Sequence, residues 1–316
     1  MRILHGSESV PEPDQGSVLT IGNFDGVHRG HQALLESVVQ TAREAGRRAC
    51  VYTFDPHPRR LLAPERGERL LMTPAQLEQS LESFGVDLLI REPFTLGFAK
   101  QSAEEFLTQV IQRRLRPYRI FVGGRFHFGK ARAGSTETLQ GLAPRLGIQV
   151  ELIPQVEVGG ADASSTRIRG AVSEGEVAEA TRCLGRPYSI WGRVIHGDHR
   201  GRTLGFPTAN LHTENELLPA LGVYASTVRL LEQGRPAGES LRAVTNVGTR
   251  PTFEPGQVLT EVHLLGFEGD LYGRELAVEF HERIRAERKF SGPEALRKQI
   301  AADSERALEL LGSHGY

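Results

Sequence analysis

The sequence predicts two domains, an α/β domain with a doubly wound parallel sheet and a β-rich domain that ends in a helix. Three observations lead to this prediction. The first half alternates short apolar, β-branched runs with amphipathic runs of helical period. The second half has short apolar runs separated by glycine and proline. The length of 316 residues is enough for two domains that each bury a core.

The first half is predicted to contain strands and helices in alternation. Apolar β-branched runs indicate the strands, and apolar residues that recur every three or four positions indicate the helices. Because the two alternate, we expect parallel strands that are covered on both faces. The expected strands are 18–21, 48–54, 86–90, 119–123 and 148–153, and the expected helices are 30–45, 74–83, 102–115, 136–146 and 166–182.

The composition changes near residues 185–188, and the domain boundary is predicted near 183–187, which gives domains of 1–183 and 184–316. Short strands with glycine and proline between them are typical of an antiparallel barrel or sandwich. Pro293 and Glu294 suit the first turn of a closing helix. The strands expected in this half are 189–197, 222–231, 241–248, 258–266 and 276–283.

Composition excludes several classes of protein. The formal net charge is −1, so no general attraction to nucleic acid or to an anionic membrane is expected, and a phosphate site must be local. The chain has no apolar run of membrane-spanning length and no apolar stretch typical of a signal peptide, which predicts a cytoplasmic protein. Cys50 and Cys183 lie in apolar surroundings and are expected to be inert buried thiols. Self-association is left open.

Two histidines mark the most informative segment, which follows the expected strand 18–21. His28 and His31 lie where the next helix begins, and Gly22, Gly26 and Gly30 allow the loop to turn tightly. Helix N-termini favour phosphate, and residues three apart share one face of a helix. The spacing therefore favours a phosphate site over the alternative, two surface histidines near a turn. The segment matches neither the dinucleotide fingerprint nor the P-loop.

The histidine segment is the first of seven motifs that lie between residues 18 and 311. They are Gly22–His31 (G-x-F-D-G-x-H-x-G-H), Thr53–Pro58 (TFDPHP), Ser164–Arg169 (SSTRIR), Gly201–Asn210 (GRTLGFPTAN), Asn246–Phe253 (NVGTRPTF), Glu261–Leu265 (EVHLL) and Asp270–Gly273 (DLYG). Together they resemble the prokaryotic bifunctional riboflavin kinase/FMN adenylyltransferase (FAD synthetase) family, and the first resembles the HxGH signature of nucleotidylyltransferases.

This resemblance implies a Rossmann-like nucleotidylyltransferase domain followed by a flavokinase barrel. It implies two reactions that both consume ATP. The C-terminal domain is expected to phosphorylate riboflavin to FMN, and the N-terminal domain to adenylylate FMN to FAD with release of pyrophosphate. The expected partners are therefore riboflavin, FMN and ATP, with Mg²⁺ as the cofactor, and neither nucleic acid nor membrane.

For adenylyl transfer, the resemblance places the site at the histidine motif and the serine-rich motif. The phosphate of FMN is already an anion, so catalysis needs positioning and charge neutralisation rather than a base. His28 and His31 are expected to donate to the triphosphate, and Ser164 also suits a helix cap. The implied phosphate-binding residues are Gly22, Asn23, Phe24, Asp25, Gly30, Ser164, Ser165, Thr166, Arg167 and Arg169.

Three positions depart from the family pattern: Ala163 replaces an Ile, Gly266 replaces an Asp, and the departure that matters most is Arg125. The family carries Asp or Asn in a VGxDFxFG motif, whereas residues 122–129 are VGGRFHFG here, with Arg125 at that position. A cation in place of an acceptor reverses the local charge. Two interpretations follow. Arg125, together with Phe126, binds FMN or an ATP phosphate in an altered site, or the adenylyltransferase half is weakened and the chain is a riboflavin kinase only.

For the kinase, the neutral 5′-hydroxyl of riboflavin benefits from a base. The resemblance assigns this role to Glu261, which the alternating pattern alone would make a solvent-facing strand residue. Thr208 and Asn210 are expected to hold Mg²⁺ through hard oxygen ligands, and Asn210 is also expected to take part in catalysis. The remaining implied residues are Gly201, Gly205, Pro207 and Asn246 for ATP, and Arg285, Glu287 and Phe290 for the flavin.

Overall fold

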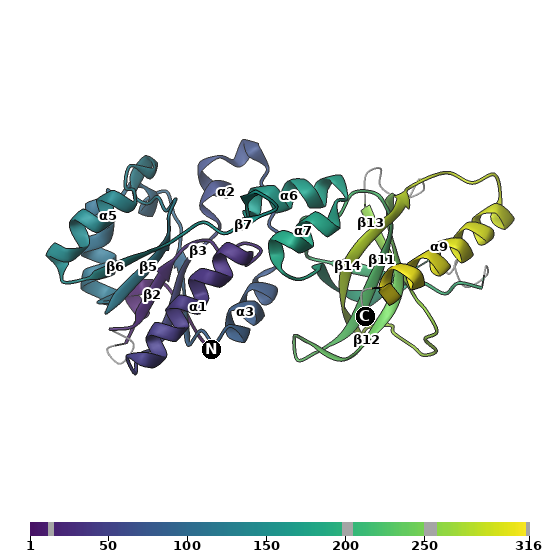
Figure 1. Cartoon of the computed structure of the whole chain (residues 1–316), viewed down its shortest axis with the longest axis horizontal. Helices are drawn as coiled ribbons and strands as arrows, with labels where there is room; N and C mark the ends of the chain where they lie inside the picture. Colours follow the sequence, from purple (N-terminus) through teal and green to yellow (C-terminus); the bar gives the residue numbers. More distant parts are fainter. Residues whose placement is uncertain (12–15, 198–204, 250–257, 314–316) are drawn as a thin grey trace. The chain divides into compact units, whose positions relative to one another are not determined.

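The computed structural model describes residues 1–11, 16–197, 205–249 and 258–313 (Figure 1). The chain divides into two compact units, each with its own sheet. The first unit comprises Met1–Arg69 and Gln76–Ala163, and the second comprises Leu70–Ala75 and Ser164–Tyr316. Within the described ranges, no helix is both long enough and apolar enough to cross a bilayer.

The first unit is built on a six-stranded sheet in the order β1-β4-β3-β2-β5-β6, and all its neighbouring strands are parallel. This confirms the predicted parallel sheet and adds one strand, β1, at an edge. β1 was not predicted because it buries only one side chain, Leu4. The strands are β1 Arg2–His5, β2 Val18–Ile21, β3 Ala49–Asp55, β4 Leu88–Pro93, β5 Arg119–Gly123 and β6 Gln149–Ile153.

Both faces of this sheet are covered, as the alternation predicted. Helix α1, Arg29–Glu44, packs across β2, β3 and β5. Alternate strand residues such as Leu19 and Ile21 join a second layer with Phe106 and Ile111. The two faces therefore use alternate residues of the same strands, as the period of two in a strand requires. The other helices of this part of the chain are α2 Pro58–Leu62, α3 Pro74–Ser83, α4 Ala103–Glu105, the π-helix Phe106–Leu115 and α5 Thr136–Leu142. Short 3₁₀ turns lie at Ser7–Ser9, Pro64–Arg66, Phe98–Lys100, Lys130–Arg132 and Ala143–Leu146. A separate two-stranded ribbon consists of β7, Glu157–Val158, and β8, Ala161–Asp162.

The helix expected over 166–182 is two helices, α6 Ser165–Glu174 and α7 Val177–Leu184, so this prediction was wrong in its continuity. Gly175 ends α6 in a left-handed conformation, with φ at 82°. A glycine is favoured there because a side chain would be strained at this φ. Both helices belong to the second unit. The functional boundary after residue 183 stays a prediction.

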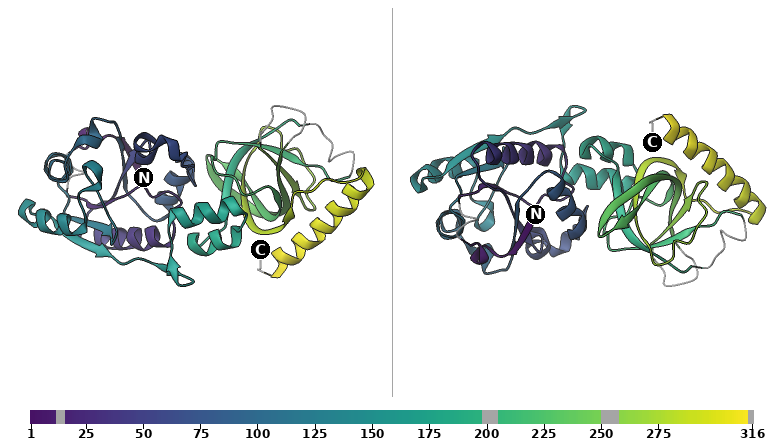
Figure 2. Two further views of the ribbon diagram at one scale, coloured as in Figure 1. Left: turned by 90° about the horizontal axis from the view of Figure 1, so that it is seen from above. Right: turned by 90° about the horizontal axis from the view of Figure 1, so that it is seen from below.

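The second unit is a closed antiparallel barrel in the order β10-β13-β12-β11-β14-β9, which decides between the barrel and the sandwich (Figure 2). Helix α9, Pro293–Ser313, lies along its outside and buries Ala307 and Leu311 against the barrel. The strands are β9 Tyr188–Ile195, β10 Ala209–Thr213, β11 Gly222–Glu232, β12 Arg235–Thr249, β13 Val258–Leu264 and β14 Glu275–Ala286. β10 was not predicted, because a glycine- and proline-rich motif leads into it.

Candidate active sites

The first candidate site lies where the strand order of the parallel sheet reverses. From β2 the chain continues through β3 to β4 on one side, whereas β5 and β6 lie on the other side. Ligands of doubly wound sheets bind beyond the carboxyl ends of the strands at such a switch point. Residues 22–31 follow β2, and residues 124–129 follow β5. The predicted histidine segment and Arg125 therefore leave adjacent strands at the expected edge.

His28 and His31 lie at the N-terminus of α1, as predicted. His28 is the N-cap, and its Nδ1 accepts a hydrogen bond of 3.4 Å from the backbone N–H of His31. The two imidazole rings are stacked, with centroids 3.7 Å apart. Because residues three apart share a helix face, both rings can address one ligand at the positive end of the helix dipole.

His31 combines burial with an unpaired polar atom. Among the described residues, no partner lies within hydrogen-bonding distance of its buried Nδ1. Burial, together with the neighbouring His28, holds the pKa of His31 well below its ordinary value of 6.5. The ring is therefore a neutral imidazole at neutral pH. Since buried polar atoms are normally paired, the free Nδ1 points to a place for a ligand atom.

The loop that precedes α1 holds two non-glycine residues in left-handed backbone conformations. Phe24 has a φ of 54° and Val27 a φ of 42°, and the latter is an outlier for a β-branched residue. Such strain costs about 1–3 kcal/mol per residue. Both side chains are fully buried, which contributes about 1.5–3 kcal/mol each and offsets the strain. The loop is therefore held in shape before any ligand arrives.

Gly30 is required by close packing rather than by backbone conformation. A Cβ at this position would lie 3.2 Å from two ring atoms of His28 and 3.8 Å from the carbonyl oxygen of Ala163. The chain segment that ends at Ala163 thus lies beside the histidine motif.

We expect Gly30→Ala to lower the rate of FAD formation by about tenfold or more, because small displacements of positioning groups are costly in catalysis. The added methyl would displace the His28 ring, whereas helix propensity would favour alanine. Gly141→Ala is the matched control, because that glycine is also helical and its Cβ would meet nothing within 4 Å. Equal rates of FAD formation by the two variants would contradict the proposed crowding.

The serine-rich motif forms the start of α6, as predicted from its capping residues. Ser164 is the N-cap, and its Oγ accepts from the backbone N–H of Arg167 at 3.3 Å. The guanidinium of Arg167 forms an ion pair with Glu179 of α7. These residues belong to the second unit and the histidines to the first. A joint phosphate site of Ser164, Ser165, Thr166, Arg167 and Arg169 with the histidines therefore stays a prediction.

The second candidate site is a row of polar side chains across three adjacent barrel strands. Glu261 of β13 lies opposite Asn210 of β10 on one side and opposite Asn246 of β12 on the other. Directly opposed residues point to the same face of a sheet. The Nδ2 of Asn246 donates to the carboxylate of Glu261 at 3.4 Å. Three residues that the family resemblance selected thus lie side by side.

Two glycines that the sequence reasoning missed make room for this row. A Cβ on Gly197 would lie 2.1 Å from the amide nitrogen of Asn210. A Cβ on Gly248 would lie 2.7 Å from a carboxylate oxygen of Glu287 and 3.2 Å from the amide nitrogen of Asn246. The predicted flavin residue Glu287 therefore approaches the row. Gly248 stands inside the motif Asn246–Phe253 but was not selected as a site residue, and Gly197 lies outside the quoted motifs.

The segment before β10 contains the other predicted nucleotide residues. Gly205 has a φ of 86°, a left-handed conformation that suits glycine, and Thr208 is half-buried. The carbonyl oxygen of Pro207 lies 2.8 Å from Nδ1 of His263. Because a carbonyl can only accept, this ring nitrogen carries the proton. Gly201 lies outside the described residues.

Arg285 and Phe290, predicted to contact the flavin, take part in anchoring α9. The guanidinium of Arg285 lies 2.8 Å from the carboxylate of Asp303, which is 2% exposed, and it also lies over the ring of Phe290. The same carboxylate accepts from Gln299 at 2.7 Å. The structure thus gives Arg285 a structural role, and its contact with the flavin stays a prediction.

Asp303→Ala should destabilise the barrel by about 2–4 kcal/mol, because it leaves the largely buried Arg285 without its partner. Glu309→Ala is the control, since it removes an exposed ion pair of the same helix and should cost less than about 1 kcal/mol. Urea unfolding followed by the fluorescence of Trp191, the single tryptophan, reports on this unit. Equal midpoints for the two variants would refute the anchoring role.

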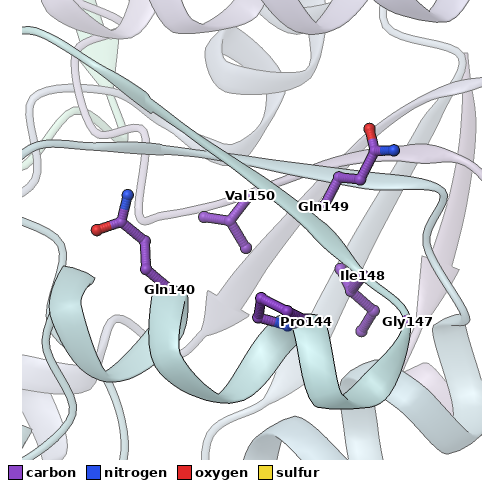
Figure 3. Close-up of a pocket in the computed structure, with 6 residues that line it drawn as sticks. All are labelled: Gln140, Pro144, Gly147, Ile148, Gln149 and Val150. Atoms are coloured by element: carbon purple, nitrogen blue, oxygen red, sulfur yellow. The ribbon is translucent and has the colours of Figure 1, made fainter.

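The two cysteines and one hollow of the first unit add no candidate site. Cys50 and Cys183 are free and buried, as expected, and burial raises the pKa of Cys50 to about 12. The hollow shown in Figure 3, between α5 and β6, has no acid, base or nucleophile among its six lining residues, Gln140, Pro144, Gly147, Ile148, Gln149 and Val150. No group of three His, Cys, Asp or Glu residues in the described ranges could hold a metal ion.

Known proteins are similar to both halves of the chain. The FAD synthetase family model matches residues 10–167, and the riboflavin kinase family model matches residues 184–311. The chain is 39% identical to the bifunctional riboflavin kinase/FMN adenylyltransferase of Pseudomonas fluorescens, over 99% of this chain and 100% of the relative. It is 37% identical to that of Escherichia coli K12, over 99% and 98% of the two chains.

A solved structure has the same fold over nearly the whole chain. It is described as a macrolide-efflux protein from Streptococcus pneumoniae, and it superposes with a TM-score of 0.87 at 33% identity. The match covers 96% of this chain and 98% of that one. With both halves matched by their family models and bacterial relatives aligned from end to end, the chain belongs to the bifunctional riboflavin kinase/FMN adenylyltransferase family.

Proposed function

We propose that this chain makes both flavin cofactors, by phosphorylating riboflavin to FMN and then adenylylating FMN to FAD, with ATP as co-substrate in each step. The observation that carries this proposal is the presence of two separate constellations, the stacked histidines at α1 and the polar row in the barrel. The FAD synthetase match includes Arg125, which favours the bifunctional enzyme over the kinase-only alternative.

For adenylyl transfer, the phosphate oxygen of FMN attacks the α-phosphorus of ATP, and pyrophosphate leaves. His31 would donate a hydrogen bond to the charge that grows on the α-phosphate oxygens, and His28 would hold the triphosphate. Gly22, Asn23, Phe24 and Asp25 would supply the shaped loop. The buried, partly strained backbone of this loop supports a preorganised site, since it needs little reorganisation at the moment of reaction.

For the kinase, Glu261 would accept the proton of the riboflavin 5′-hydroxyl as its oxygen attacks the γ-phosphorus of ATP. Asn246, which donates to this carboxylate, would keep the acceptor oxygen oriented. Thr208 and Asn210 would hold Mg²⁺, which neutralises phosphate charge when it is bound. Their hydroxyl and amide oxygens suit this hard cation, which usually shares its ligands with substrate phosphates and water.

The domain assignment that fits these roles is 1–183 for the adenylyltransferase and 184–316 for the kinase. The riboflavin kinase match begins at residue 184, which supports this boundary. The use of ATP in both steps supports a cytoplasmic location. Riboflavin, FMN and ATP are the partners that the proposed reactions require.

The purified protein should convert riboflavin and ATP first to FMN and then to FAD, and chromatography separates the two products. A second reaction supplied with FMN and ATP tests the adenylyltransferase alone. FMN formation without FAD in either reaction would contradict the bifunctional proposal and leave the kinase-only alternative.

A further inference from the structure

We propose that His263 is a positioning residue for riboflavin phosphorylation, whose imidazole holds the turn that presents Thr208 to Mg²⁺ and ATP. The inference rests on the proposed kinase reaction and names the group that keeps one predicted metal ligand in place. It gives a role to the histidine of the motif Glu261–Leu265, which is neither the predicted base nor a predicted ligand.

Thr208 lies just outside the regular part of the barrel. In the described chain, strand β10 begins to pair with β13 at Ala209 and with β9 at Asn210. Asn210 is therefore fixed by neighbouring strands on both sides, and its amide lies close to Gly197. Thr208 precedes both ladders, so the turn that leads into β10 decides where its hydroxyl lies.

The ring of His263 contacts two successive residues of this turn. Its Nδ1–H donates to the carbonyl oxygen of Pro207, which lies 2.8 Å away and can only accept. The ring of Phe206 meets the imidazole edge to face, with centroids 5.5 Å apart and an interplanar angle of 82°. Because proline has no backbone N–H, the carbonyl is the only backbone group that can tie Pro207 to the barrel by a hydrogen bond. The side chain of His263 thus continues the attachment where the strand pairing ends.

His263 can hold the turn because its own strand, β13, is paired on both sides, with β10 and with β12. Its neighbours Val262 and Leu264 are buried in the barrel, whereas His263 is half-buried and lies on the other face of the strand. Glu261 shares this face, since residues two apart on a strand point the same way. All these residues belong to the second unit. Loss of the imidazole should therefore loosen the turn and leave the predicted base in place.

Hydrogen exchange of the full-length protein without ligands tests the contact itself. In His263→Ala, backbone amides of a peptide spanning residues 206–211 should exchange about threefold to tenfold faster, the factor that corresponds to one net hydrogen bond. His263→Asn should restore slow exchange, because its amide nitrogen is bonded to Cγ and takes the place of Nδ1. His263→Gln should not restore it, because its amide lies one bond farther out, at the place of Nε2. Mass spectrometry of the digested protein gives the exchange rates.

The kinetics of riboflavin phosphorylation test the positioning role. A loosened turn must be ordered when ATP binds, so the KM for ATP should rise about threefold to tenfold in His263→Ala, while the KM for riboflavin stays unchanged. His263→Asn should return the KM for ATP to the wild-type value, and His263→Gln should not. FAD synthesis from supplied FMN should not change in any of these variants.

His281→Ala is the matched control, because it removes another histidine hydrogen bond of 2.8 Å, to Thr227, on a strand that adjoins neither β10 nor β13. Its exchange over residues 206–211 and its KM for ATP should match wild type. Unchanged exchange in His263→Ala would overturn the inference. An equal loss of kcat in His263→Ala and His263→Asn with normal exchange would also overturn it, since the imidazole would then act on the substrate. Wild-type protein that makes no FMN would instead refute the proposed kinase, while hydrogen exchange would still report on the turn.

Discussion

Glu261→Gln should abolish FMN formation from riboflavin while FAD synthesis from supplied FMN continues. Glutamine keeps the shape of the side chain and can still lie between Asn210 and Asn246, but it cannot accept the hydroxyl proton. General-base catalysis contributes about 10²–10⁴ in rate, and the kinase rate should fall by that factor. The histidine motif of the adenylyltransferase belongs to the other unit, and FAD synthesis should retain its rate.

The measurement follows FMN and FAD in parallel reactions, one started from riboflavin and one from FMN. Glu268→Gln is the control, since Glu268 is an exposed glutamate shortly after β13. A kinase rate within tenfold of wild type for Glu261→Gln would show that this carboxylate is not the base. Loss of both activities would show that the substitution acts on the fold instead of the reaction.

The sequence could select the residues of this row but not their arrangement. Asn210, Asn246 and Glu261 stand in three separate motifs, and only the register of a closed barrel brings them into one line. Strand β10 escaped prediction because the glycine- and proline-rich run before it resembles a turn. Burial of its Ala209, Asn210 and Leu211 within the barrel outweighs that weak local signal.

In the first unit, too, some structural features follow from the local sequence and others only from tertiary packing. Alternating apolar patterns predicted β2 and α1, and the capping position of His28 follows from local sequence. The left-handed backbone at Val27 could not be predicted, because intrinsic preference opposes it and only complete burial sustains it. Likewise, Arg125 stood out as a departure, but no periodic pattern links it to its ion-pair partner Asp162, 37 positions later.

His31→Ala should abolish FAD formation and leave riboflavin phosphorylation intact, the reverse of the Glu261 result. The substitution removes the imidazole whose buried Nδ1 has no partner among the described residues. Loss of one preorganised donor to developing charge costs about 10²–10³ in rate. His5→Ala is the control, an exposed histidine of the same unit. FAD formation by His31→Ala at the rate of His5→Ala would refute the catalytic role.

The pH dependence of stability gives His31 a second, independent test. Burial and His28 hold the pKa of His31 well below 6.5, so below that pH the unfolded chain binds a proton that the folded chain does not. The contribution of His31 to stability is therefore present above pH 6.5 and is lost as the pH falls through and below it. His31→Ala removes this contribution to stability. The melting temperatures at pH 7.5 and 5.5, values chosen about one unit either side of the ordinary histidine pKa, should therefore differ less for the variant than for wild type. An unchanged difference would mean that His31 is not the buried neutral imidazole on which the proposed adenylyl transfer depends.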